Sequence, residues 1–115
     1  LGTGKPIREF LFADDLAEAI HIILKASKKK ISKACSNKFP LINVGSGSRL
    51  SIKELAKMIA KISNFKGKIF FDKKFPDGTP KKNLNSKIIY SLGWRPQIKI
   101  LNGLKKSYSF YADNK

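Results

Sequence analysis

Few residues in this sequence are of types that carry chemistry, and two of them, Cys35 and His21, occur only once. A single cysteine cannot form an internal disulfide, and a single histidine leaves few ligand sets for a metal ion. Gly45-Ser46-Gly47 could hold a phosphate on backbone N–H groups, but a short Gly-x-Gly motif is also common in turns. The sequence therefore predicts no metal site, favours a turn at the glycines, and is typical of a reducing, cytoplasmic setting.

Basic residues dominate the charge: the 115 residues include 24 lysines and arginines against 8 acidic residues, a formal net charge of +16. Specific readout of nucleic acid relies on arginine forks and aromatic platforms. The arginines here are only Arg8, Arg49 and Arg95, and the lysines are spread along the whole chain. A small anionic ligand, such as a nucleoside diphosphate, is compatible with this charge. A small basic nucleic-acid-binding module is the alternative from a different class.

These side chains must be positioned by a mixture of strands and helices. Strands are predicted at 7–12, 41–44 and 68–72, and helices at 14–28, 52–63 and 101–112. Residues 51–54, Ser-Ile-Lys-Glu, have the pattern of a capping box at the start of the second helix. A short further helix is predicted to start at Asn85 or Ser86 and to end at Leu92-Gly93. The order β-α-β-α-β-α-α predicts an α/β protein.

Loops and length limit the architecture further. Residues 31–40 are predicted to form a polar loop, and residues 75–80 cannot be regular because two prolines and a glycine interrupt them. No apolar run approaches the ~18 residues that a membrane-spanning helix needs. The length suits one domain. The sequence starts at Leu1 without an initiator methionine, so we expect it to be a piece of a longer chain.

Three segments resemble, in order and spacing, the C-terminal part of the GDP-L-fucose synthase branch of the extended short-chain dehydrogenase/reductase family. Residues 2–17, which contain Arg-Glu-Phe and then Asp-Asp before a helix, resemble the whole superfamily. Residues 42–56, which begin with Ile-Asn-Val-Gly, also resemble the whole superfamily rather than one branch. Residues 71–82 are the narrow match, because Pro-Asp-Gly-Thr-Pro followed by two lysines looks like the fucose synthase branch.

The resemblance implies an α/β fold that is the C-terminal substrate-binding portion of such an enzyme, with the Rossmann domain largely missing. Residues 1–115 would then form one nucleotide-sugar-binding part. Within it, a strand near 41–45 would join the sheet of the absent N-terminal part. One departure from the family pattern is Leu1, which stands where a tryptophan often packs on the substrate.

The resemblance also implies three substrate-binding residues. Arg8 matches an arginine that contacts the substrate diphosphate, and a guanidinium fork suits phosphate oxygens. Lys82 matches a lysine near the same diphosphate, with Lys81 beside it. Asp77 matches an aspartate that binds ribose or sugar hydroxyls, and a carboxylate is an acceptor that suits a diol.

Each of these roles has a structural alternative. Arg8 could instead pair with a carboxylate on a neighbouring residue, either Glu9, Asp14 or Asp15. Asp77 could instead form an Asx turn with Gly78.

For activity, the resemblance implies epimerisation of GDP-4-dehydro-6-deoxy-D-mannose at C3 and C5, followed by reduction of the C4 ketone with NADPH. This is oxidoreductase and isomerase chemistry of GDP-L-fucose biosynthesis. In this family the glycine-rich dinucleotide turn and the Ser…Tyr-x-x-x-Lys set lie in the N-terminal part. We therefore expect no catalytic and no cofactor-binding residue in this chain, NADP(H) bound by the missing part, and no activity of these residues alone.

The implied complete enzyme is a cytoplasmic homodimer that takes a GDP-sugar, with no specific nucleic acid and no membrane partner. The alternative within the same class is another extended short-chain epimerase or reductase that acts on a UDP- or dTDP-sugar.

Overall fold

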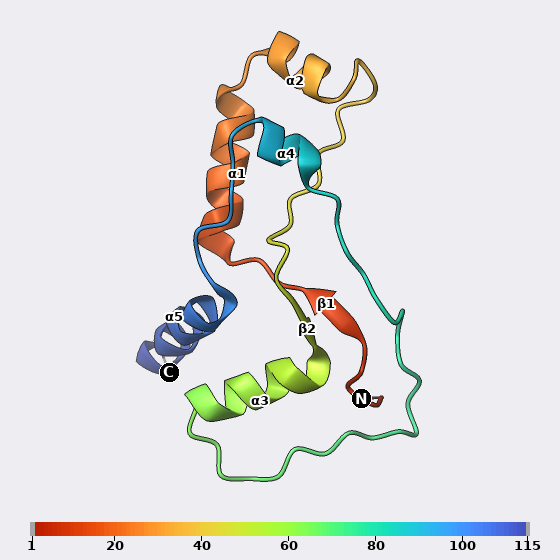
Figure 1. Cartoon of the computed structure of the whole chain (residues 1–115). Helices are drawn as coiled ribbons and strands as arrows, with labels where there is room; N and C mark the ends of the chain where they lie inside the picture. Colours follow the sequence, from red (N-terminus) through yellow and green to blue (C-terminus); the bar gives the residue numbers. More distant parts are fainter. Residues whose placement is uncertain (1, 115) are drawn as a thin grey trace.

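The computed structural model describes residues 2–114, so Leu1 lies outside the described part of the chain. Its elements are β1 (Ile7–Glu9), α1 (Ala13–Lys25), α2 (Lys28–Ala34), β2 (Arg49–Ser51), α3 (Ile52–Ile62), α4 (Lys87–Ser91) and α5 (Ile100–Asp113). The predicted mixture of helices and strands is confirmed. Helices α1, α2 and α4 group at one end of the molecule, and β1, β2, α3 and α5 group at the other (Figure 1).

The helices begin where the local sequence predicts. Helix α1 has two acidic residues in its first turn and Lys25 in its last, which matches the helix dipole. The capping box of α3 is confirmed: the Glu54 N–H donates to Ser51 Oγ (3.1 Å), and the Ser51 N–H donates to Glu54 Oε2 (2.8 Å). Asn85 accepts from the Lys87 N–H (3.2 Å) at the start of the short helix α4.

Two segments differ from their predictions. The expected loop at 31–40 is wrong at its start, because α2 continues to Ala34. Ser27 caps this helix by accepting from the Lys30 N–H (3.2 Å), a cap that a run of lysines conceals. The expected strand at 68–72 is irregular in the structure, since no neighbouring segment pairs with it as a ladder.

The sheet within residues 2–114 has two strands. β1 pairs antiparallel with β2, with Ile7 opposite Ser51 and Glu9 opposite Arg49. The first strand ends before residue 10 rather than at 12, because α1 already starts at Ala13. Strand β2 was not predicted, since three residues between a turn and a cap show no period. The segment near 41–45 pairs with no strand in the described residues.

The core lies between α1 and α4. Its buried residues are Ala19, Ile89, Leu92 and Trp94, and Ile42 and Val44 pack against them. The indole of Trp94 is only 1% exposed and stacks on Tyr90, with ring centroids 6.0 Å apart. This cluster is small for 115 residues, so the core rests largely on one indole ring.

A buried carboxylate ties the core to the C-terminal segment. Asp15, in the first turn of α1, accepts from the N–H groups of Gln97 (3.1 Å) and Ile98 (3.0 Å). The Trp94 indole N–H donates to the backbone carbonyl of the same Asp15 (3.0 Å). Because Asp15 is 2% exposed, these bonds satisfy a group that would be costly to bury alone.

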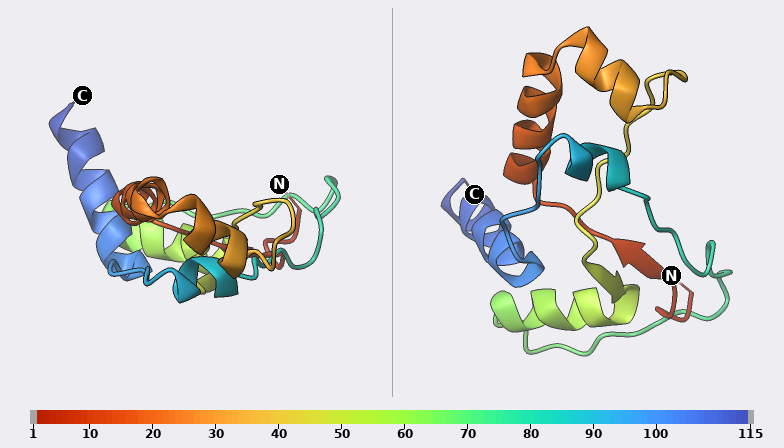
Figure 2. Two further views of the ribbon diagram at one scale, coloured as in Figure 1. Left: turned by 90° about the horizontal axis from the view of Figure 1, so that it is seen from above. Right: turned by 45° about the horizontal axis from the view of Figure 1, so that its top comes forward.

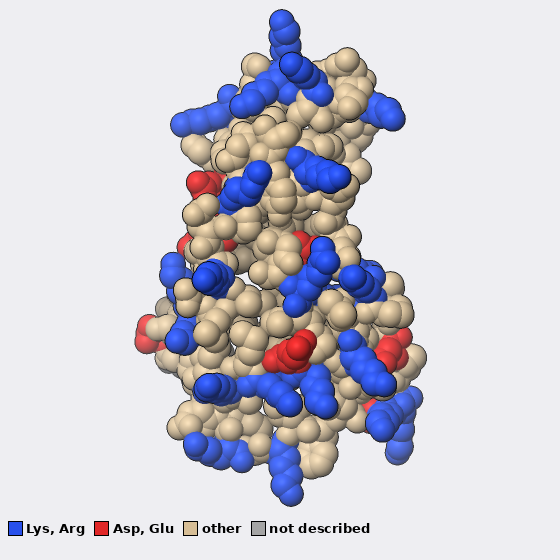
Figure 3. Space-filling view, viewed as in Figure 1, with Lys and Arg blue, Asp and Glu red and all other residues tan. Residues whose placement is uncertain are grey.

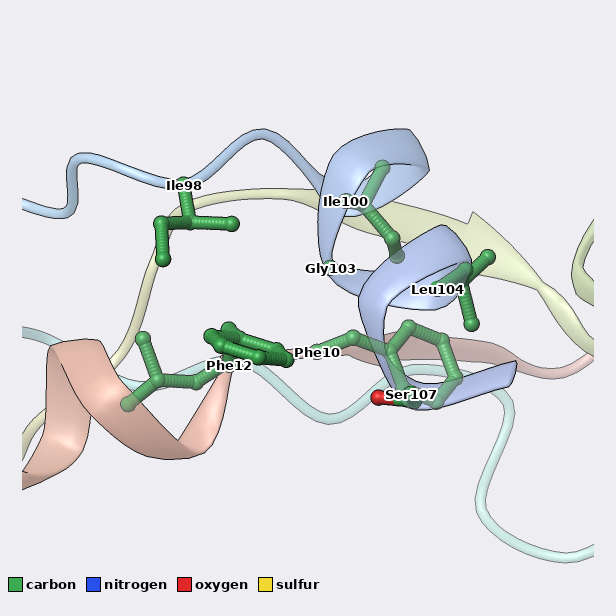
Figure 4. Close-up of a pocket in the computed structure, with 8 residues that line it drawn as sticks. Phe10, Phe12, Ile98, Ile100, Gly103, Leu104 and Ser107 are labelled. Carbon is green, nitrogen blue, oxygen red and sulfur yellow. The ribbon is translucent and has the colours of Figure 1, made fainter. Parts of the chain in front are cut away.

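A second, smaller packing seam lies between α5 and the connection from β1 to α1. Phe10 and Phe12 face Ile98 and Leu104 across an apolar hollow of about 140 Å³ (Figure 4). Gly103 in α5 lies against the Phe12 ring, and a Cβ there would be 3.0 Å from a ring carbon. The hollow is smaller than the ~300–1,000 Å³ of typical ligand pockets, which indicates packing rather than a ligand site.

The chain is extended and thin. It measures 54 × 35 × 19 Å, and its radius of gyration is 17.4 Å, against about 13 Å for a compact domain of about this size. Seen from above, the elements lie in a shallow layer (Figure 2). Many large apolar side chains are exposed, among them Leu24 (78%) and Leu41 (66%). In the described residues, no helix is both long and apolar enough to cross a membrane.

Candidate functional site

A surface hollow, here named the basic hollow, lies where β1 meets residues 80–82. The Ile7 N–H donates to the carbonyl of Pro80 (2.8 Å), and the Lys82 N–H donates to the carbonyl of Ile7 (3.4 Å). This short pairing brings Arg8, Lys81 and Lys82 to one hollow of about 550 Å³. The predicted residues Arg8 and Lys82 therefore lie together, although they are far apart in sequence.

Arg8 is held by backbone carbonyls. Its Nη1 donates to the carbonyls of Ile7 (2.8 Å) and Thr79 (2.7 Å). The remaining N–H groups of the guanidinium make no hydrogen bond within residues 2–114. Within the described residues Arg8 forms no ion pair with Glu9, Asp14 or Asp15, and Glu9 and Asp15 accept backbone N–H groups instead. Arg8 is thus oriented with donors left for an anion.

The two lysines of the basic hollow are exposed side chains. Lys81 pairs with Ile7 as an isolated bridge, and Lys82 follows it. Lys81, which the resemblance left without a role, lines the basic hollow as well. A guanidinium with two ammonium groups nearby suits a doubly charged phosphate group.

Asp77 does not line the hollow, but it precedes Gly78, where an added Cβ would lie 3.1 Å from Arg8 Nη2. Its carboxylate accepts from the Thr3 N–H (2.7 Å) and from Thr3 Oγ1 (2.5 Å), so it ties the N-terminal segment to residues 72–80. Gly2 has a positive φ of 69°, and a Cβ there would overlap Asp77 Oδ1. The expected Asx turn with Gly78 is not the contact seen, and the binding of substrate hydroxyls by Asp77 stays a prediction.

The Asp77–Thr3 contact should depend on pH. The side-chain and backbone hydrogen bonds from Thr3 lower the pKa of Asp77. Its stabilising contribution is therefore complete above the unfolded-state pKa of about 3.9 and is lost as the pH falls through the lower folded-state pKa. In an NMR titration, the Thr3 amide signal should stay constant from pH 7 to about 5 and move only below about pH 4.

The matched control is Thr3→Val, which removes the hydroxyl donor and retains the backbone N–H. The midpoint followed at Asp77 should then rise toward the ordinary aspartate pKa. A midpoint that is the same in both proteins would contradict the assignment.

Glu9 is the site residue that sequence reasoning missed. Its Oε1 accepts from the Gly47 N–H (2.7 Å), and its Oε2 accepts from the Leu84 N–H (3.0 Å). Glu9 lines the basic hollow and also a neighbouring polar hollow of about 500 Å³, which Arg49 and Ser86 line as well. The only signal in the sequence was a carboxylate beside Arg8, which predicted an ion pair rather than this contact.

The glycine motif does not form a dinucleotide site. Gly45-Ser46-Gly47 leads into β2, and α3 begins only at Ile52, so the glycines do not open a helix. In the dinucleotide-binding motif the glycine-rich turn opens a helix whose N-terminus binds the pyrophosphate. Gly47 instead donates its N–H to Glu9, and residues 45–48 are irregular, with no turn assigned at the glycines.

The spacing Tyr-x-x-x-Lys occurs once in the sequence, at Tyr111 and Lys115. Tyr111 is 58% exposed near the end of α5, and it does not line the basic hollow. Lys115 lies outside the described residues. Tyr111 is therefore not part of the basic hollow.

The excess positive charge is not confined to the site. Lysine and arginine side chains are scattered over the visible face from end to end, over both groups of helices (Figure 3). This matches the spread expected from the sequence.

Comparison with known proteins agrees with the expected family. A model of the NAD dependent epimerase/dehydratase family matches residues 1–45. Probable GDP-L-fucose synthase 1 of Oryza sativa subsp. japonica is 41% identical over 98% of this chain and 32% of its own length. The chain thus spans about a third of the length of the curated relatives that it matches.

Solved structures agree as well. A GDP-6-OMe-4-keto-L-xylo-heptose reductase from C. jejuni superposes with a TM-score of 0.86 at 37% identity, over 99% of this chain and 33% of that one. The GDP-mannoheptose C4 reductase MlghC from Campylobacter jejuni, with NADP bound, has a TM-score of 0.76 at 33% identity, over 96% and 33%. The expected fold is confirmed, because nearly the whole chain superposes on about one third of these reductases. Residues 1–45 carry the pattern of the NAD dependent epimerase/dehydratase family, and nearly the whole chain is similar to about one third of a GDP-L-fucose synthase.

Proposed function

We propose that this chain supplies the GDP-sugar-binding side of the cleft in a GDP-L-fucose synthase. The observation that carries the proposal is the basic hollow, where Arg8 and Lys82 meet with guanidinium donors unused. These residues would bind the diphosphate, and Asp77 at the edge would accept from hydroxyl groups. The complete enzyme would epimerise GDP-4-dehydro-6-deoxy-D-mannose at C3 and C5 and reduce the C4 ketone, most simply as a cytoplasmic homodimer.

The cofactor belongs to another part of that enzyme in this proposal. NADP(H) supplies the hydride, and the described residues do not fit it, because the glycine motif leads into a strand. The contribution of this chain is to hold the sugar so that its ketone meets the nicotinamide. We therefore expect these 115 residues alone to oxidise no NADPH when the substrate is present.

The segment near 41–45 also supports the proposal that another part of the enzyme packs against this chain. Ile42, Asn43 and Val44 make no backbone hydrogen bond within residues 2–114. Ile42 and Val44 pack on the core, while Leu41 is exposed, which is the alternation of a strand. Unpaired strand edges normally bind another strand. We propose that this strand joins a sheet formed by the part of the enzyme that the match does not cover.

The exposed apolar face of α1 supports the same proposal. Leu16, Ile20 and Leu24 follow one another at four-residue spacing and are 41%, 48% and 78% exposed. Such a stripe is typical of a helix face that packs against another layer. The sheet that receives the strand is the natural cover for it.

A comparison of the affinities of three nucleotides for the chain tests the proposal. GDP, UDP and dTDP are titrated separately into the purified chain by calorimetry, and we expect GDP to bind most tightly. Tighter binding of UDP or dTDP would favour the alternative enzyme class. No binding of any of the three, together with DNA binding that weakens steeply with salt, would replace the proposal by a basic nucleic-acid-binding module.

A further inference from the structure

Glu9 connects three segments around the basic hollow. It lies on β1 beside Arg8, and each oxygen of its carboxylate accepts one backbone N–H. Gly47 is 38 residues away in the sequence, and Leu84 is 75 residues away. Leu84 follows Lys82 by two residues, so the bond to its N–H restrains the segment that carries the lysines.

The surroundings of Glu9 leave its carboxylate little freedom. A Cβ on Gly45 would overlap Glu9 Oε1, so the carboxylate lies directly over that glycine. The segment 45–48 beneath it is fixed from the other side, because Ser46 Oγ donates to the carbonyl of Phe10 (2.5 Å) and the Phe10 N–H donates to the carbonyl of Ser48 (3.2 Å). The half-buried carboxylate is therefore held at both ends by fixed backbone.

We propose that Glu9 is a positioning residue for diphosphate binding. Its carboxylate holds the Leu84 N–H, and through it keeps Lys82 at the hollow that Arg8 lines. The inference rests on the proposed function for the identity of the ligand. The contacts themselves do not depend on that function.

The direction in which Glu9→Gln changes the affinity for a diphosphate separates this role from simple electrostatics. Glu9 is the only acidic residue among those that line the basic hollow. If it acted through charge alone, Glu9→Gln would remove a repulsive negative charge and strengthen binding of a diphosphate. If it positions the segment, Glu9→Gln weakens binding, because the amide keeps one acceptor oxygen and presents an NH₂ to the second N–H.

The experiment measures GDP affinity by calorimetry and amide hydrogen exchange by NMR on the 115-residue chain. Glu9→Gln should lower GDP affinity about tenfold, as expected for one lost charge-assisted hydrogen bond, and should speed exchange at Leu84 or Gly47. Gly45→Ala, which displaces the carboxylate without a change of charge, should shift both quantities in the same direction. Glu18→Gln, an exposed residue of α1 with the same charge change, should alter neither.

The outcomes distinguish the positioning role of Glu9 from the proposed binding of GDP. Tighter GDP binding in Glu9→Gln, or exchange at both amides equal to the wild type, would overturn the positioning role while leaving GDP binding intact. Faster exchange with wild-type protein that binds no GDP would overturn the proposed function and leave the contact as a structural one. Weaker binding together with faster exchange, in both Glu9→Gln and Gly45→Ala, would support the inference.

Discussion

Replacing Trp94 with alanine should lower the free energy of unfolding by about 3–5 kcal/mol, the usual cost of truncating a buried aromatic residue. The indole is 1% exposed within a cluster of only four core residues. The variant also removes the stacking on Tyr90 and leaves the carbonyl of Asp15 without the indole donor. Urea unfolding followed by circular dichroism measures the change, because Trp94 is the only tryptophan and fluorescence would be lost.

Two variants serve as comparisons for this result. Trp94→Phe keeps most of the ring and loses the N–H donor, so it should cost less than the alanine variant. Leu101→Ala removes a side chain that is 43% exposed on α5 and should cost little by comparison. If Trp94→Ala and Leu101→Ala agreed within about 0.5 kcal/mol, the indole would not be the centre of the core.

The second large effect concerns Arg8, whose replacement by alanine should weaken GDP binding by about 10- to 150-fold. This range corresponds to about 1.5–3 kcal/mol for a hydrogen bond to a charged group. The guanidinium lines the basic hollow and is oriented by the carbonyls of Ile7 and Thr79. Calorimetric titration of GDP into both proteins gives the ratio of dissociation constants.

The control for charge is Lys57→Ala, which removes one positive charge from the exposed side of α3, away from the basic hollow. Arg8→Lys keeps the charge but loses the planar fork, so its affinity should fall between those of wild type and Arg8→Ala. Equal losses for Arg8→Ala and Lys57→Ala would mean that GDP senses only net charge. That result would remove Arg8 from the proposed site.

Local sequence signals predicted four of the five helices in the described part of the chain, missed α2, and predicted the strands poorly. The capping box at residues 51–54 and the apolar spacing of α3 reside in neighbouring residues, so they can be recognised without the rest of the chain. The irregular backbone at 75–80 was predicted for the same reason, since proline restricts its own backbone and donates no N–H. Strand β2 and the segment near 41–45 were misjudged or left open, because a strand is defined by the partner that it pairs with.

The site divides in the same way. The residues that could bind a diphosphate are visible in the sequence, because a guanidinium and an ammonium group have that capacity wherever they lie. The folded chain is needed to see that Arg8 and Lys82 line one hollow, that Asp77 holds Thr3, and that Glu9 binds two backbone N–H groups rather than an arginine. The reason is physical: these contacts join residues up to 75 positions apart, and their geometry follows from the packing of the intervening chain.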